Sequence, residues 1–313
     1  MINMKKIFSL AATATLFLAG CGAATLEGEN TAESGPVEER EASELVVGVS
    51  ISTLNNPFFV SLDEGISDLA SENGTEVKSV DAQNDTAKQT NDVDDLIQQG
   101  VDILLINPVD SSAITPAVES ANAAGIPVIT IDRSSDGGEV VTLVASDNTE
   151  GGEMAAEYIM EISGTDVVTV QLEGVPGASA TRERGKGFMN IAEGSLDVVD
   201  SQTANFDRAE GLTVMENMLQ ANPEIKAVFA QNDEMALGAI EAIQAAGLTD
   251  SIQVVGFDGT EDGIKAVEEG KLSATVAQQP GEMGRLAMQA AYDYFAGETI
   301  EDYIASPLEL VKE

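Results

Sequence analysis

The chain of 313 residues carries 15 Lys and Arg against 54 Asp and Glu, which gives a formal net charge of −39, and it contains no His and one Cys. The length predicts about two domains, and 43% hydrophobic with 22% charged residues is typical of a folded protein. Such acidity excludes a nucleic-acid partner, because phosphate binding needs a basic surface. The missing His and single Cys exclude imidazole-based catalysis, intrachain disulfides and thiolate zinc sites. We expect no metal and no cofactor.

Residues 1–20 have the pattern of a secretory signal peptide. Two lysines precede an uncharged run of 14 residues over 7–20, which is too short for a bilayer span of about 20 residues. Residues 18–21, Leu-Ala-Gly-Cys, resemble a lipobox, in which Cys21 takes a diacylglycerol group before cleavage. We therefore expect a lipoprotein anchored through Cys21. An ordinary signal peptide followed by an incidental cysteine is the alternative.

The next segment, residues 22–44, contains seven Glu and no apolar periodicity. Low hydrophobicity and repulsion between like charges predict a flexible tether. We assign residues 21–44 to the acylated cysteine and its acidic tether.

From residue 45 onward, short β-branched runs alternate with stretches of helical periodicity. The first half predicts strands at 45–52, 75–82, 102–107 and 126–132, and helices at 57–72, 86–99 and 112–124. The second half predicts strands at 139–146, 166–174, 196–206, 226–232, 252–259, 273–279 and 306–312, and helices at 148–162, 181–193, 208–221, 233–246, 261–269 and 281–296. This alternation indicates parallel sheets. The shared plan predicts an α/β protein of two doubly wound parallel sheets that face each other across a cleft.

Several predicted strands end in polar side chains, namely Asn107, Asp132 with Arg133, Asn232, Asp258 and Gln278. Each alone is typical of a helix N-cap or a turn, but ligands of open parallel sheets bind beyond the carboxyl ends of the strands. Amide, carboxylate and guanidinium groups suit a neutral ligand with many hydroxyls. Phe58 and Phe59 would point about 100° apart on the first helix, so we expect at least one to reach the cleft and pack against a sugar.

Eight stretches between residues 45 and 313 are similar to a known family: STLNNPFFVSL, ILLINPVDS, IPVITIDR, ASDN, RERGKGF, FAQNDEMALGA, VVGFDGT and TVAQQP. They resemble the D-ribose-binding proteins, members of the periplasmic-binding-protein-like I family that serve sugar ABC importers. The resemblance implies sugar contacts from Asn56, Phe58, Phe59, Asn107, Asp132, Arg133, Arg184, Phe206, Asn232, Asp258 and Gln278. Without it, Arg184 would be interpreted as a surface charge and Phe206 as a core residue.

The resemblance also implies three chain crossings between the lobes. The N-terminal lobe would comprise 45–146 plus 279–307, and the C-terminal lobe 147–278 plus 308–313, joined by a three-segment hinge. It implies a monomeric, non-enzymatic protein that captures D-ribose by hinge closure and delivers it to an ABC permease with its ATPase subunit. The lipobox and tether, which the familiar soluble relatives lack, predict attachment to the outer face of the cytoplasmic membrane.

Other interpretations use the same fold or the same residues. A sugar sensor that presents a pentose or hexose to a membrane signalling receptor needs the same binding chemistry and stays open. A LacI-type repressor core would need a basic N-terminal helix-turn-helix. Asp132 and Asp258 are a conceivable catalytic pair, but no G-x-S-x-G or S-x-x-K motif accompanies them. The spacing of an EF-hand calcium loop is matched by Asp258, Thr260, Asp262, Gly263 and Glu269. We reject a calcium site, because Thr260 replaces the carboxylate or amide that the third position needs.

Overall fold

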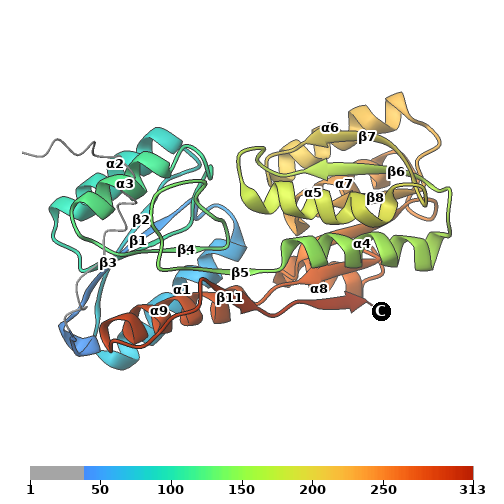
Figure 1. Cartoon of the computed structure of the whole chain (residues 1–313). Helices are drawn as coiled ribbons and strands as arrows, with labels where there is room; N and C mark the ends of the chain where they lie inside the picture. Colours follow the sequence, from blue (N-terminus) through green and yellow to red (C-terminus); the bar gives the residue numbers. More distant parts are fainter. Residues whose placement is uncertain (1–38, 313) are drawn as a thin grey trace, which may run out of the picture. The chain divides into compact units, whose positions relative to one another are not determined.

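The computed structural model describes residues 39–312, so the signal peptide, Cys21 and most of the expected tether lie outside the described residues. The described residues all belong to one compact unit. Two six-stranded sheets, each with helices on both faces, form an N-terminal and a C-terminal lobe (Figure 1). The prediction of two doubly wound α/β lobes is confirmed. None of the helices in the described part is long and apolar enough to cross a membrane.

The N-terminal lobe contains a fully parallel sheet in the order β11-β5-β4-β3-β1-β2. Its strands are β1 (Val46–Ile51), β2 (Glu76–Asp81), β3 (Ile103–Ile106), β4 (Val128–Ile131), β5 (Thr142–Ser146) and β11 (Tyr303–Ser306). One face packs against α1 (Pro57–Asn73) and α9 (Pro280–Phe295), the other against α2 (Thr86–Gln98) and α3 (Thr115–Ala123). Because β3 is covered on both faces, its side chains enter the two cores alternately, which explains its continuous apolar sequence.

The C-terminal lobe repeats this strand order as β12-β10-β9-β8-β6-β7, with β12 antiparallel to β10. Its strands are β6 (Val168–Glu173), β7 (Asp197–Thr203), β8 (Ala227–Ala230), β9 (Gln253–Asp258), β10 (Ala274–Ala277) and β12 (Glu309–Lys312). Helices α4 (Asn148–Ser163) and α5 (Ser179–Ala192) cover one face. The other face packs against α6 (Arg208–Ala221), α7 (Asp233–Ala245) and α8 (Glu261–Glu268).

Reciprocal glycines allow three pairs of helices to pack closely. In each pair, one glycine on either helix faces the backbone of the partner, and an added Cβ would overlap that backbone. The glycines are Gly65 and Gly284 for α1 and α9, Gly152 and Gly187 for α4 and α5, and Gly211 and Gly238 for α6 and α7. The spacing of these helices, and of the residues at their ends, is therefore fixed by backbone contact.

The chain passes from one sheet to the other after β5, after β10 and after β11. The prediction of a single final strand over residues 306–312 is wrong, because the chain crosses between the sheets within this region. Two short strands occupy this region, and they are separated by Pro307 and Leu308. β11 pairs with β5 in the N-terminal lobe, whereas β12 pairs with β10 in the C-terminal lobe. Proline cannot donate to a strand ladder, so the pairing is interrupted where the chain changes sheets.

Residues 39–44 pack on the N-terminal lobe, and they include the short 3₁₀ helix η1 (Ala42–Glu44). The Arg40 backbone N–H donates to the Phe295 carbonyl oxygen at 3.0 Å, and its guanidinium forms an ion pair with Asp102. The prediction that the tether continues to residue 44 is therefore wrong for these six residues. The Glu-rich composition of the segment concealed the contacts made by its single Arg.

Candidate ligand-binding site

A small cavity lies between the two lobes. The N-terminal lobe lines it with Asn56, Phe58, Phe59, Asp132 and Arg133. The C-terminal lobe lines it with Ala180, Arg184, Phe206, Asn232 and Asp258. Except for Ala180, all of these were proposed from the sequence as sugar contacts. The structure brings them together, and their contact with a sugar stays a prediction.

Strand ends place the polar residues at one edge of each sheet. Asp132 directly follows β4, Asn232 follows β8, and Asp258 is the last residue of β9. Asn56 and Asn232 are also N-caps: their side chains accept hydrogen bonds from Phe58 N and Met235 N, each at 2.9 Å. Asn56 and Asn232 therefore each cap a helix and line the cavity at the same time.

Phenylalanine rings from both lobes line the cavity. Phe58 and Phe59 form an edge-to-face pair with centroids 5.2 Å apart, and both side chains face the cavity. The Arg133 guanidinium carbon lies 5.1 Å from the Phe59 centroid and 5.4 Å from that of Phe206. Arg133 therefore contacts one aromatic ring from each lobe, a geometry that favours cation–π attraction.

Each lobe contributes one carboxylate and one guanidinium. Asp132 Oδ2 lies 3.4 Å from Arg133 Nε, and Asp258 Oδ1 lies 3.3 Å from Arg184 Nη1. All four side chains are at most 5% exposed. With the four groups ionised their charges cancel, so the cavity suits a neutral ligand that both donates and accepts hydrogen bonds.

Backbone carbonyl groups anchor both guanidinium groups. Arg133 Nη1 donates to Pro108 O at 2.9 Å. Arg184 Nη1 donates to Gln231 O at 2.6 Å, and its guanidinium carbon lies 3.8 Å from the Phe257 centroid. These contacts stabilise two charges that burial would otherwise disfavour.

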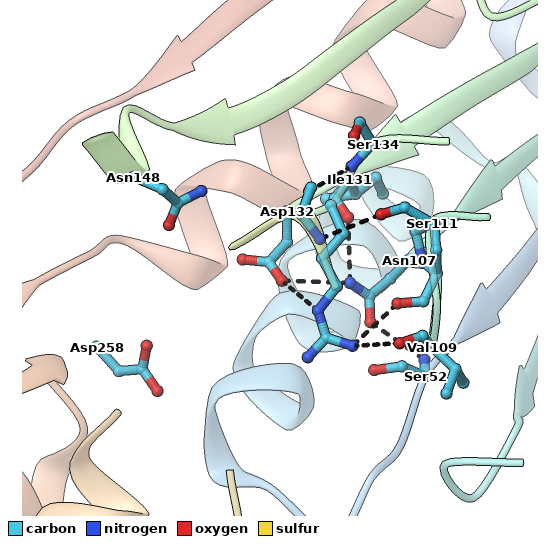
Figure 2. Close-up of polar contacts among 12 residues, drawn as sticks. Ser52, Asn107, Val109, Ser111, Ile131, Asp132, Ser134, Asn148 and Asp258 are labelled. Atoms are coloured by element: carbon cyan, nitrogen blue, oxygen red, sulfur yellow. Dashed lines mark hydrogen bonds and ion pairs between the residues drawn. The ribbon is translucent and has the colours of Figure 1, made fainter. Parts of the chain in front are cut away.

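The two remaining predicted site residues, Asn107 and Gln278, do not line the cavity. Asn107 Nδ2 donates to Asp132 Oδ2 at 3.4 Å and to Ile131 O at 3.1 Å (Figure 2). In the other lobe, Gln278 Nε2 donates to Asp258 Oδ1 at 2.9 Å. The structure thus places one buried amide donor behind each carboxylate, where it orients an acceptor that does face the cavity.

Burial dominates the protonation of the two carboxyl groups. It raises the pKa of Asp258 to about 8, although the Arg184 guanidinium acts in the opposite direction. It also raises the pKa of Asp132 against the opposing effect of Arg133, and it lowers the pKa of the Arg133 guanidinium. A ligand that donates hydrogen bonds to these carboxyl groups would favour their ionised form.

Backbone strain is concentrated at the same cavity. Among the described non-glycine residues, seven have positive φ, and three of them line the cavity: Asp132 at 63°, Phe206 at 59° and Asp258 at 117°. Each such residue costs on the order of 1–3 kcal/mol and persists where its surroundings fix it. Strain of this kind is typical of functional sites.

Sequence reasoning missed Asn148, whose Oδ1 accepts a hydrogen bond from Arg184 Nε at 2.8 Å. Asp132 was identified as a polar residue at the end of a strand, and Asn148 gives the same signal, because Asp147 and Asn148 directly follow β5. Ala180, which has no polar group, offered no signal.

The rejected EF-hand spacing coincides with a helix rather than a loop. Thr260 caps α8, its Oγ1 accepting from Gly263 N at 3.1 Å, and Asp262 forms an ion pair with Arg208 at 3.1 Å. Over residues 39–312, no group of three or more His, Cys, Asp or Glu side chains is arranged to hold a metal ion.

Two kinds of comparison identify relatives. The family model described as periplasmic binding protein domain matches residues 47–299. The ribose import binding protein RbsB of Bacillus subtilis (strain 168) is 57% identical over 307 residues, which cover 98% of this chain and 99% of the relative. The RbsB protein of Escherichia coli (strain K12) is 45% identical over 311 residues, 99% of each chain.

Solved structures agree with this assignment. An ABC transporter solute binding protein from Mycobacterium smegmatis with bound glycerol has a TM-score of 0.82 at 35% identity, covering 86% of this chain and 94% of its own. One from Bacillus halodurans C-125 with bound myo-inositol has a TM-score of 0.81 at 35% identity, covering 89% and 96%. The fold, the cavity between the lobes and the matched family model lead to one conclusion: this chain belongs to the periplasmic binding protein domain family.

Proposed function

We propose that this protein captures D-ribose between its lobes and delivers it to an ABC sugar importer. The observation that carries the proposal is the buried set of two carboxylate–guanidinium pairs, one from each lobe, beside three phenylalanine rings. Two relatives of 57% and 45% identity are described as ribose import binding proteins, which supports ribose as the ligand. They are described as binding proteins rather than enzymes, and the family implies an extracytoplasmic location.

The geometry explains how a monosaccharide would be held. Carboxylates accept hydrogen bonds from hydroxyls, guanidinium groups donate to them, and phenylalanine faces cover the apolar C–H surface of the ring. Hydrogen bonds to charged groups contribute about 1.5–3 kcal/mol each, and a missing hydroxyl leaves a buried group unpaired. Discrimination between sugars follows from that cost.

Closure of the lobes would follow from the division of the site between them. A sugar that contacts both lobes binds the closed state more tightly than the open state and shifts the population accordingly. We assign the lobes to residues 45–146 plus 279–307 and 147–278 plus 308–313, and the division of strands between the sheets supports these bounds. We expect a monomer, with one chain's mass in light scattering.

Calorimetry tests the ligand. We expect ribose to bind more tightly than about 1 mM, which corresponds to about −4.1 kcal/mol. Allose, xylose, galactose and glucose serve as comparison sugars. Ribose affinity weaker than this value, or tighter binding of a hexose, would contradict the proposal.

Replacing the central carboxylate tests the site. Asp258→Ala should abolish ribose binding, because it removes a buried acceptor and leaves the Arg184 guanidinium without its ion pair. Asp262→Ala is the matched control, since this carboxylate is exposed and pairs with Arg208 outside the cavity. Circular dichroism would verify that both variants fold. Binding retained by Asp258→Ala would refute the site.

We also propose that Cys21, which lies outside the described residues, carries a lipid that anchors the protein to the outer face of the cytoplasmic membrane. The lipobox pattern and the extracytoplasmic family support this. Cys21→Ser protein that has lost its signal peptide should be released from isolated membranes, because it lacks the lipid. A Cys21→Ser protein that still partitions into membranes after processing would contradict the anchor.

A further inference from the structure

We propose that Asn148 is a positioning residue for sugar binding, whose side-chain amide holds the Arg184 guanidinium in its binding orientation before a sugar arrives. The proposal rests on the proposed function, because that function assigns a sugar contact to Arg184. Asn148 itself does not line the cavity.

The Asn148 side chain is 2% exposed, and both ends of its amide are used. Its Oδ1 accepts from Arg184 Nε at 2.8 Å, and its Nδ2 donates to Glu183 Oε2 at 3.3 Å. A flipped amide would place its NH₂ against the Arg184 N–H and its oxygen against the Glu183 carboxylate. The two charged neighbours therefore determine the orientation of the amide.

Arg184 is held at two nitrogens and one face. Nε donates to Asn148, Nη1 donates to Gln231 O at 2.6 Å, and the guanidinium lies against Phe257. No acceptor among the described residues bonds to Nη2. Because the guanidinium is planar and rigid, fixing Nε and Nη1 also fixes the direction of the Nη2 hydrogens, which are left for a ligand.

This support lies entirely within the C-terminal lobe. Asn148 is the first residue of α4 and Arg184 lies on α5. The two helices are in backbone contact, because Gly152 faces Arg184 O and Gly187 faces Thr149 O. The contact between amide and guanidinium thus does not depend on closure. It is preorganised, and preorganised contacts lower the entropic cost of binding.

Exchange measurements on the sugar-free full-length protein test the contact directly. In ¹H–¹⁵N spectra, the Arg184 Nε–Hε signal is assigned by its loss in Arg184→Lys. Asn148→Leu, which keeps the side-chain size and removes the acceptor, should speed exchange of this hydrogen with water at least tenfold. Asn148→Ala is a second, smaller replacement with the same expectation. Unchanged exchange in these variants would overturn the proposal.

Calorimetry tests the consequence for binding. Asn148→Leu should weaken ribose affinity about tenfold, and Asn148→Asp, which keeps an acceptor oxygen, should recover most of it. An affinity unchanged in Asn148→Leu, or no recovery in Asn148→Asp, would overturn the proposal.

Asn190→Leu is the matched control. Asn190 Nδ2 donates to Glu153 Oε1 at 2.8 Å, an exposed amide–carboxylate contact between the same two helices. It should change neither the Arg184 signal nor the affinity. If the wild-type protein failed to bind ribose, the proposed function would be contradicted, while the exchange measurement would still decide the role of Asn148.

Discussion

Asp258 faces the cavity as a hydrogen-bond acceptor, yet burial favours its protonated form and raises its pKa to about 8. Sugar hydroxyls that donate to the carboxylate would stabilise the ionised form, so the pKa falls on binding and a proton is released. We therefore expect ribose affinity to rise as the pH increases toward about 8 and to level off above it.

Calorimetry at pH 7 in buffers of different ionisation enthalpy measures this release. At pH 7 the observed binding heat should depend on the ionisation enthalpy of the buffer. Near pH 10, Asp258 is already ionised before ribose binds, so the same measurement should give buffer-independent heats and serves as the control. Buffer-independent heats at pH 7 would show that Asp258 is already ionised in the empty cavity.

The polar residues at strand ends could be predicted from the sequence, because β4, β8 and β9 are largely apolar strands that are followed by, or end in, a polar group. Arg184 and Phe206 could not be predicted in that way. Arg184 is one charge among several on an amphipathic helix, and Phe206 reaches the cavity through a left-handed turn after an edge strand. Only the resemblance to the binding-protein family identified Arg184 and Phe206. Neither the strand-end pattern nor the resemblance identified Asn148.

Among the elements, the α4–α5 pair offers a test of the reciprocal glycines. Gly187→Ala should destabilise the protein by about 1–3 kcal/mol, because its Cβ would overlap Thr149 O and force the helices apart. Gly185→Ala on the same helix is the control: its Cβ would meet the movable amide ends of Gln231 and Gln171 at 3.1 and 3.3 Å. Urea unfolding would compare them, and equal midpoints would contradict the role of Gly187.

The positions of most helices and strands followed from periodicity, because strands buried on both faces are short apolar runs and the helices carry one apolar stripe. Two predictions, the single final strand and the tether up to residue 44, are wrong because both depend on contacts between residues far apart in the sequence. The final strand was predicted as one because sequence pattern does not reveal which sheet a strand joins. Residues 39–44 were assigned to the tether because composition does not reveal that Arg40 finds Asp102 far along the chain.

For the whole molecule, the net charge of −39 has a measurable consequence. Repulsion among carboxylates destabilises the compact state, and salt screens it, with a Debye length of about 10 Å at 0.1 M. We expect the melting temperature to rise by a few degrees between about 0.01 M and about 0.5 M NaCl. A constant or falling melting temperature in NaCl would contradict this expectation.

The interleaved chain also sets an order for folding. The N-terminal lobe takes Met283, Ala287 and Met288 of its core from α9, and its last strand, β11, ends at Ser306. The C-terminal lobe is one continuous stretch from α4 to β10 and lacks only its edge strand β12. A chain that emerges N-terminus first can therefore form all of its C-terminal lobe except β12 before α9 and β11 complete the N-terminal lobe. Until then, residues 45–146 keep part of their apolar surface uncovered.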